Sequence, residues 1–171
     1  MNWKLLIAIS AVICLTGCGY HTPNRSDSWV GGNANTLFVD LFANRSTEPY
    51  LENYLTDQVV LQMSRTRMVE LTERQDLADL VLTGTIDSFS ADAIAYDAGD
   101  RITEYSARMS VLVKLVNRDD GQVLWQKRLS RSERFGAFVN KTLQLEGQDL
   151  AAREVAKRLA EDLYANLFNS F

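Results

Sequence analysis

The sequence predicts an α+β fold, a two-layer sandwich in which two helices pack on one face of a mostly antiparallel sheet of about four strands. The predicted elements follow the order strand, helix, strands, helix along the chain. The longer strand segments alternate between apolar and polar residues, which is typical of a sheet with one buried and one open face. Two other segments carry apolar residues at helical spacing.

The first strand and the first helix are expected between residues 36 and 63. Residues 36–42 are rich in strand formers, and residues 43–46 suit a turn. A helix is then expected to start at Thr47-Glu48-Pro49, where a hydroxyl caps exposed N–H groups and an acid and a proline suit the first turn. Apolar residues follow at every fourth position, as one stripe that packs on the sheet: Leu51, Leu55, Val59 and Met63.

The middle of the chain predicts strands. Residues 68–72 suit a short strand, and residues 79–89 alternate like a half-buried one. Residues 102–116 alternate more clearly and would reach about 45 Å, which is longer than a usual strand. An Asp-Gly pair at 120–121 is typical of a hairpin turn, so residues 123–131 should pair back antiparallel.

The last predicted element is a helix over residues 148–167. Its exposed side carries the pairs Asp149 with Arg153 and Glu154 with Arg158, each four residues apart. Its buried side follows helical spacing through Ala152, Val155, Ala156, Leu159, Ala160, Leu163 and Leu167.

The N-terminus indicates a bacterial lipoprotein signal peptide. Lys4 precedes an apolar run at residues 5–15, which is too short to span a bilayer as a helix of roughly 20 apolar residues. Leu15-Thr16-Gly17-Cys18 then matches the lipobox, in which small residues enter the peptidase cleft and the cysteine thiolate accepts diacylglycerol. We expect cleavage before Cys18 and lipidation of that residue. The alternative is an ordinary secretory signal that is cut elsewhere.

These features divide the chain into a signal peptide at residues 1–17, a lipidated tether at 18–35 and a single sandwich domain at 36–171. The tether is polar and is broken by proline and glycine. Several acyl chains hold a protein on a membrane without a transmembrane helix, because each buried methylene contributes about 0.8 kcal/mol. The residue after Cys18 is Gly19 rather than Asp, which favours the outer membrane over the inner one.

The composition excludes several function classes. Without Lys4 the chain keeps 17 Lys and Arg against 22 Asp and Glu, so we expect no nucleic-acid partner. Cys14 leaves with the signal peptide and Cys18 carries lipid, so no disulfide is expected. His21 is the one histidine and lies beside the anchor, which argues against a metal site or a Ser/His pair. We therefore expect no cofactor and no enzymatic activity.

Five segments occur in order over nearly the whole mature chain. They are Cys18-Gly19-Tyr20-His21, Ala78-Asp79-Leu80-Val81-Leu82-Thr83-Gly84-Thr85-Ile86, Thr103-Glu104-Tyr105, Gly121-Gln122-Val123-Leu124-Trp125 and Ala156-Lys157-Arg158-Leu159-Ala160-Glu161-Asp162-Leu163. Through them the chain resembles the LPS-assembly lipoprotein LptE family. The resemblance implies a lipoprotein that sits as a plug inside the outer-membrane barrel LptD and helps lipopolysaccharide pass into the outer leaflet.

Lipopolysaccharide is an anionic glycolipid, so a site for it needs Lys or Arg beside its phosphates. The resemblance implies basic residues in the loop before the Glu-Tyr strand and in the segment before the last helix. The nearest matches are Arg101 and Lys141. A solvated surface charge is the alternative for each of them.

A second basic cluster follows the hairpin and contains Lys127, Arg128, Arg131 and Arg134. Arg128 and Arg134 share strand parity, so they lie on one face if the strand continues. Such a stripe suits lipid phosphates or acidic groups on a barrel wall, or it is the ordinary charged face of a sheet. The apolar residues 135–139 beside it suit either a docked loop or the core. The rival function is a structural lipoprotein of another envelope complex, such as a secretion system.

Overall fold

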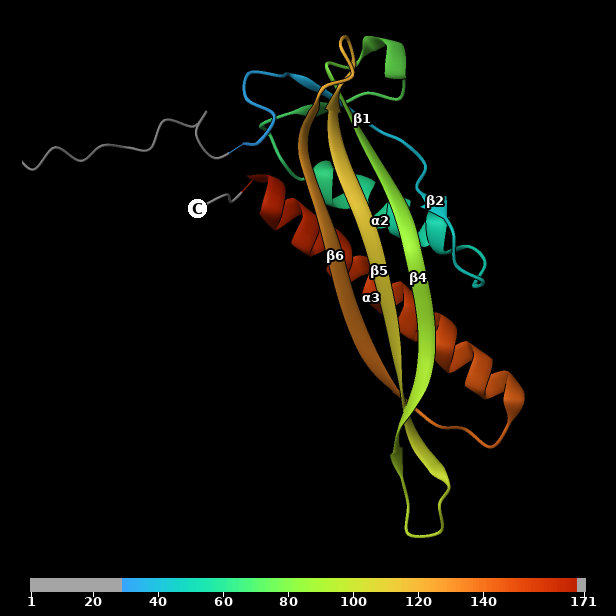
Figure 1. Cartoon of the computed structure of the whole chain (residues 1–171). Coiled ribbons are helices and arrows are strands. Elements are labelled where there is room, and N and C mark those ends of the chain that lie inside the picture. The colour runs from blue at the N-terminus through green and yellow to red at the C-terminus, as the bar shows by residue number, and fades with distance from the viewer. Residues whose placement is uncertain (1–28, 169–171) are drawn as a thin grey trace, which may run out of the picture.

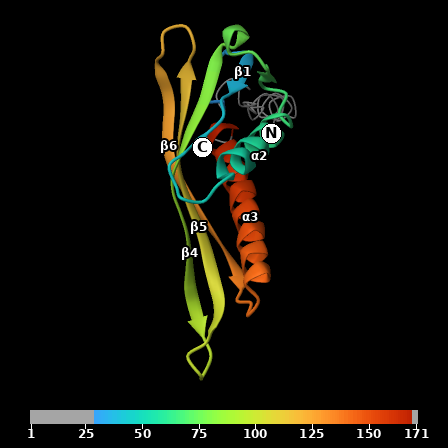
Figure 2. The same cartoon turned by 90° about the vertical axis from the view of Figure 1, so that its right-hand side faces the viewer.

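The computed structural model describes residues 29–168, which form a helix layer on one side of a twisted sheet (Figures 1 and 2). The predicted signal peptide and Cys18 lie outside the described residues. The strands are β1 (Thr36–Val39), β2 (Ala43–Asn44), β3 (Glu70–Leu71), β4 (Leu80–Tyr96), β5 (Ile102–Asn117) and β6 (Val123–Gly136). The helices are α2 (Leu51–Met63), the short 3₁₀ helix η1 (Gln75–Leu77) and α3 (Lys141–Phe168).

The sheet has six strands in the order β3-β1-β4-β5-β6, with β2 also paired to β4. The α+β class with two α-helices is confirmed, but the expectation of about four mostly antiparallel strands is wrong. The long strands β4, β5 and β6 are antiparallel, whereas β1 and β2 run parallel to β4, and β3 runs parallel to β1. Parallel neighbours need a crossover connection, and α2 supplies it between residues 44 and 70. The sheet is therefore mixed.

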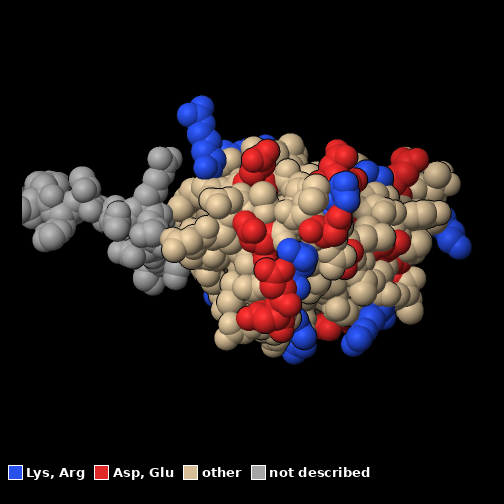
Figure 3. All heavy atoms as spheres, turned by 90° about the horizontal axis from the view of Figure 1, so that it is seen from above, with Lys and Arg blue, Asp and Glu red and all other residues tan. Residues whose placement is uncertain are grey.

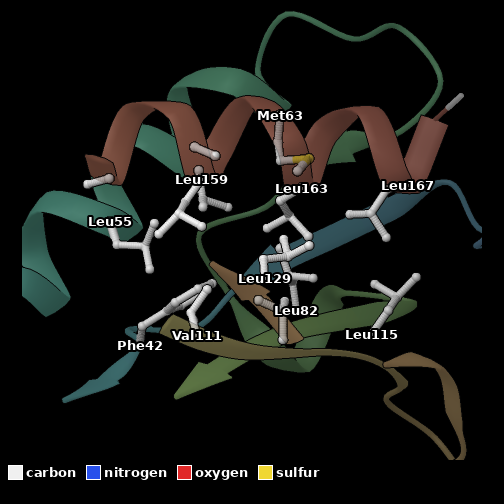
Figure 4. Packing of buried hydrophobic residues seen from close by; sticks show 14 of the residues in the cluster. Phe42, Leu55, Met63, Leu82, Val111, Leu115, Leu129, Leu159, Leu163 and Leu167 are labelled. Atoms are coloured by element: carbon white, nitrogen blue, oxygen red, sulfur yellow. The ribbon is translucent and has the colours of Figure 1, made fainter. Parts of the chain in front are cut away.

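The core lies between the sheet and the two helices. Every second residue of β5 from Ala107 to Leu115 is buried beneath α3, as the alternation predicts. Leucines of α3 meet Leu82, Leu115 and Leu129 of the sheet, and Met63 and Leu55 of α2 close the same layer (Figure 4). One continuous apolar cluster therefore holds both layers together.

Both helices begin at residues that differ from the prediction. Tyr50 is the N-cap of α2 with a left-handed φ of 68°, and no side chain caps this helix, so Thr47 does not have the predicted role. Asn44 instead holds the loop, because its amide donates to the Glu48 carbonyl and to the Glu52 carboxylate at 2.8 Å each. The second helix, α3, starts at Lys141 rather than at residue 148.

Asn140 explains the early start of α3. Its side-chain oxygen accepts the N–H groups of Thr142 at 2.8 Å and Leu143 at 3.3 Å, which is the usual N-cap arrangement. The first two turns were missed because Leu143 and Leu145 are exposed and do not continue the buried stripe.

The packed domain also begins before the expected boundary at residue 36. Trp29 is only 5 % exposed and stacks on Phe168 with ring centroids 4.3 Å apart. The Val30 N–H donates to the Leu167 carbonyl at 3.1 Å. An indole ring buries a large apolar area, so it joins the end of α3 to the core despite the polar sequence around it.

Asp79 connects the start of β4 to the start of β1. Its carboxylate accepts the backbone N–H groups of Asn35 at 2.8 Å and Thr36 at 3.0 Å. In return the Asp79 N–H donates to the Thr36 hydroxyl at 2.8 Å. The two backbone N–H groups lower the pKa of Asp79 from its usual value, since they stabilise the ionised form.

We expect Gly84→Ala to lower the free energy of unfolding by about 1–3 kcal/mol, because an added Cβ would lie 2.3 Å from the buried ring of Phe42. Gly136→Ala is the matched control, since no atom lies within 4 Å of its Cβ position. The control should change stability by less than about 0.5 kcal/mol. Urea denaturation of both variants measures the difference, and equal stabilities would contradict the close packing of Phe42 on Gly84.

We expect Asp79→Asn to lower the free energy of unfolding by about 1 kcal/mol at pH 7. A carboxyl whose pKa is lowered in the folded state stabilises the fold above its unfolded pKa of about 3.9, and this contribution is lost as pH falls through the folded pKa. The difference in the free energy of unfolding between wild type and variant should therefore become smaller below about pH 4. Asp57→Asn, at an exposed position on α2, is the control. A difference in the free energy of unfolding that does not change with pH would contradict the stabilising role of the ionised Asp79 carboxylate.

Candidate functional site

The four predicted basic residues lie in three places. Arg101 is in the turn between β4 and β5, and Arg128 and Arg134 are on β6. Lys141 was expected before the last helix, but it is the first residue of α3 because Asn140 caps the helix there. All four are exposed.

Three of these residues, Arg101, Arg134 and Lys141, lie toward the same end of the molecule, which we call the distal end and define as residues 94–104 and 134–150. Gly136 at the end of β6 pairs with Glu104, and the Ala137 N–H donates to the Thr103 carbonyl at 3.0 Å. This pairing brings the start of α3 beside the start of β5. The β4–β5 hairpin extends beyond β6 and α3 at this end (Figure 1).

Arg101 is oriented by Asp97, four residues earlier in the same turn. The guanidinium contacts the Asp97 carboxylate at 2.9 Å, while 84 % of the Arg101 side chain remains exposed. The N–H groups of Arg101 and Gly99 donate to the same carboxylate, and they lower the pKa of Asp97. Because an exposed ion pair contributes only about 0–1 kcal/mol, the guanidinium remains able to bind a phosphate.

The two arginines of β6 differ in their surroundings. The strand continues to Gly136, so Arg128 and Arg134 share the open face of the sheet, as their parity predicts. Arg128 lies near the middle of that face and contacts the carboxylate of Asp87 at 2.9 Å. Arg134 lies at the distal end, and its nearest carboxylate is Glu104 at 4.0 Å.

The other two members of the basic cluster face α3. Lys127 contacts the side chain of Asn166 at 2.5 Å, and Arg131 pairs with Asp162 through two nitrogens. This pairing raises the pKa of Arg131. These two cations therefore join β6 to α3 and do not face the same surface as Arg128.

The distal end also carries exposed apolar side chains, of which the sequence had indicated only residues 138 and 139, as part of the apolar segment 135–139. They are Ile94, Tyr96, Ile102, Phe138, Val139, Leu143, Leu145 and Leu150. Phe135 is half-buried and stacks on Tyr105 at 5.4 Å, whereas Phe138 is 47 % exposed and Val139 is fully exposed. Residues 138–139 are therefore outside the core. In the sequence, this apolar surface could have been recognised from Leu143 and Leu145, because they do not lie on the buried stripe of α3.

A shallow, mostly apolar pocket of about 310 Å³ opens between β6 and the first turns of α3. Phe135, Phe138 and Leu150 line it, and Gly147 leaves room at its base. Glu133, Arg134 and Glu154 stand at its rim. Apolar walls beside a cation suit a ligand with both hydrocarbon and anionic parts.

Within residues 29–168 no three His, Cys, Asp or Glu side chains are placed to hold a metal ion. None of the helices in that range is long and apolar enough to cross a membrane. The end opposite the hairpin shows acidic and basic side chains interspersed (Figure 3).

A family model described as "LptE: Lipopolysaccharide-assembly" matches residues 34–167. No curated protein matches the sequence. Among solved structures, the rare lipoprotein B of Shewanella oneidensis is 12 % identical with a TM-score of 0.52, over 80 % of this chain and 96 % of that one. A minor lipoprotein of Acinetobacter baumannii is 14 % identical with a TM-score of 0.52, over 79 % and 93 %.

A third similar structure is PelC of Paraburkholderia phytofirmans, which is described as a dodecamer. It is 16 % identical with a TM-score of 0.56, over 80 % of this chain and 90 % of that one. At these identities the solved structures show a shared fold.

Proposed function

The chain belongs to the LptE family of lipopolysaccharide-assembly proteins, and from this premise we propose that it is an outer-membrane lipoprotein that plugs an LptD-type β-barrel. In this role it helps the barrel insert lipopolysaccharide into the outer leaflet. The family match over residues 34–167 is the observation that carries the proposal. The role is one of binding and assembly, in which the protein makes and breaks no covalent bond.

The distal end supports direct contact with lipopolysaccharide. Arg101, Arg134 and Lys141 offer cations to the glycolipid phosphates, and Arg101 is already held in place by Asp97. The exposed apolar side chains and the pocket beside Phe138 suit acyl chains. Arg128 is less suited to this contact, because it lies opposite Leu112 near the middle of the sheet, away from the exposed apolar side chains of the distal end.

The position of Trp29 places the point where the chain enters the domain far from the distal end. Trp29 packs on Phe168 at the C-terminal end of α3, whereas Lys141 begins the same helix. A helix of 28 residues is about 42 Å long, so the chain that leads back to the proposed anchor at Cys18 leaves the domain far from the distal end.

Co-purification tests the partner. The full-length lipoprotein, made with its own lipobox and extracted from membranes in mild detergent, should bring down an LptD-type barrel in equal amount. A Cys18→Ala variant should remain unlipidated and bring down less barrel. Recovery of a secretin or another envelope assembly without such a barrel would contradict the proposal and support the rival function.

The lipopolysaccharide contact has a separate test. We expect the double variant Arg101→Glu with Lys141→Glu to bind purified lipopolysaccharide at least about fivefold more weakly, because each reversal opposes the phosphates. The matched control is Arg67→Glu with Arg74→Glu, which makes the same charge change beside β3 and η1. Equal weakening by both pairs would show that net charge alone, rather than the distal end, decides binding.

A further inference from the structure

One half of the outer edge of β4 has no strand beside it. β1 pairs with Leu80, Val81 and Leu82, and β2 pairs with Thr85 and Ile86. Within residues 29–168, the rest of β4 pairs with β5 alone. The backbone groups that point away from β5 along residues 88–96 are therefore free to pair with another strand.

This free edge has defined ends. The β4–β5 register shifts between Ile86 and Ser88, and it shifts again after Ala93. Residues 88–93 between these irregularities pair regularly with β5 from Ser110 to Tyr105. Six residues span about 20 Å, which is the length of an ordinary strand. The edge is thus a regular template for one short added strand.

The opposite edge of the sheet carries many more charged side chains than this one. β6 carries charged residues along its length: Lys127, Arg128, Arg131, Glu133 and Arg134. Charged side chains, lysine above all, discourage the pairing of an edge strand with other chains. Residues 88–96 contain no Lys, Arg or Pro and have mostly small side chains, which allow another backbone to approach.

The charge on this edge favours one kind of occupant. Asp87 is neutralised by Arg128, but Asp92 is exposed and accepts only the Ser90 hydroxyl, at 2.8 Å, among the described residues. A second copy paired through the same edge would bring no cation to Asp92, because residues 88–96 contain no Lys or Arg. A partner strand with Lys or Arg would pair with Asp92 instead.

We propose that residues 88–93 of β4 bind an extended segment of another protein as an added strand, with a Lys or Arg of that segment facing Asp92. Main-chain hydrogen bonds supply the affinity in this mode of recognition, and the side chains supply the selectivity. The proposal goes beyond the lipopolysaccharide role and does not depend on it, since it uses neither Arg101 nor Lys141.

Site-specific photo-crosslinking in native membranes tests this proposal with the full-length lipoprotein. A photoreactive amino acid replaces Ile94, which is 44 % exposed at the end of the free edge, and Ser132 on β6 is the matched control. The expected product joins position 94 to one linear segment with a Lys or Arg, located by mass spectrometry, and position 132 does not crosslink to it. A homodimer, no product at position 94, or the same segment at both positions would overturn the proposal.

Charge variants make the test specific. Asp92→Lys should lower the yield of the position 94 product at least fivefold, and Asp92→Asn should lower it less. Asp120→Lys in the β5–β6 turn makes the same charge change elsewhere and should leave the yield unchanged. A yield that is insensitive to Asp92→Lys would overturn the proposal. Co-purification of the barrel, measured in parallel, reports on the proposed function separately.

Discussion

The fold depends on the burial of one face of the sheet beneath α2 and α3. Strand alternation creates this apolar face, and α3 crosses β5 and β6 along it. Small residues at the contact, Ala152, Ala156 and Ala160, let the helix backbone approach the core closely. Because none of the helices within residues 29–168 reaches beyond the start of α3, the sheet past that point has no cover from this range, and this limit divides the described domain into two unlike ends.

The charges follow the same division. Where α3 covers the sheet, Arg131 pairs with Asp162 and Arg158 pairs with Glu133, so these ions join the layers rather than face a ligand. At the distal end Arg101 and Lys141 stand beside apolar side chains that have no helix above them. An exposed apolar surface of this kind marks a site of interaction. The buried core is therefore concentrated toward the end near Trp29, whereas many of the exposed apolar side chains lie toward the other end.

Local patterns predicted much of this fold and part of the site. Alternation located β5 within one residue, because residues on one strand face are buried together. Parity placed Arg128 and Arg134 on one face of β6. In contrast, β4 runs to Tyr96 although its last residues are rich in alanine and have low strand propensity, because pairing with the long β5 outweighs local preference. Much of the apolar distal end was not predicted, because the last helix was expected to start at residue 148, which left Leu143 and Leu145 outside it.

The sequence by itself determined the α+β class, the positions of the long strands and of most of the last helix, and the resemblance to the LptE family. These properties follow from periodicity and short motifs, which each segment contains alone. Only the tertiary structure decided that β1, β2 and β3 join the sheet in parallel, that Trp29 closes the core, and that no strand within residues 29–168 pairs with half of the β4 edge. Those outcomes depend on which segments, distant in the sequence, come to lie side by side. The hydrogen bonds and the buried contacts between such segments form only when the whole chain packs.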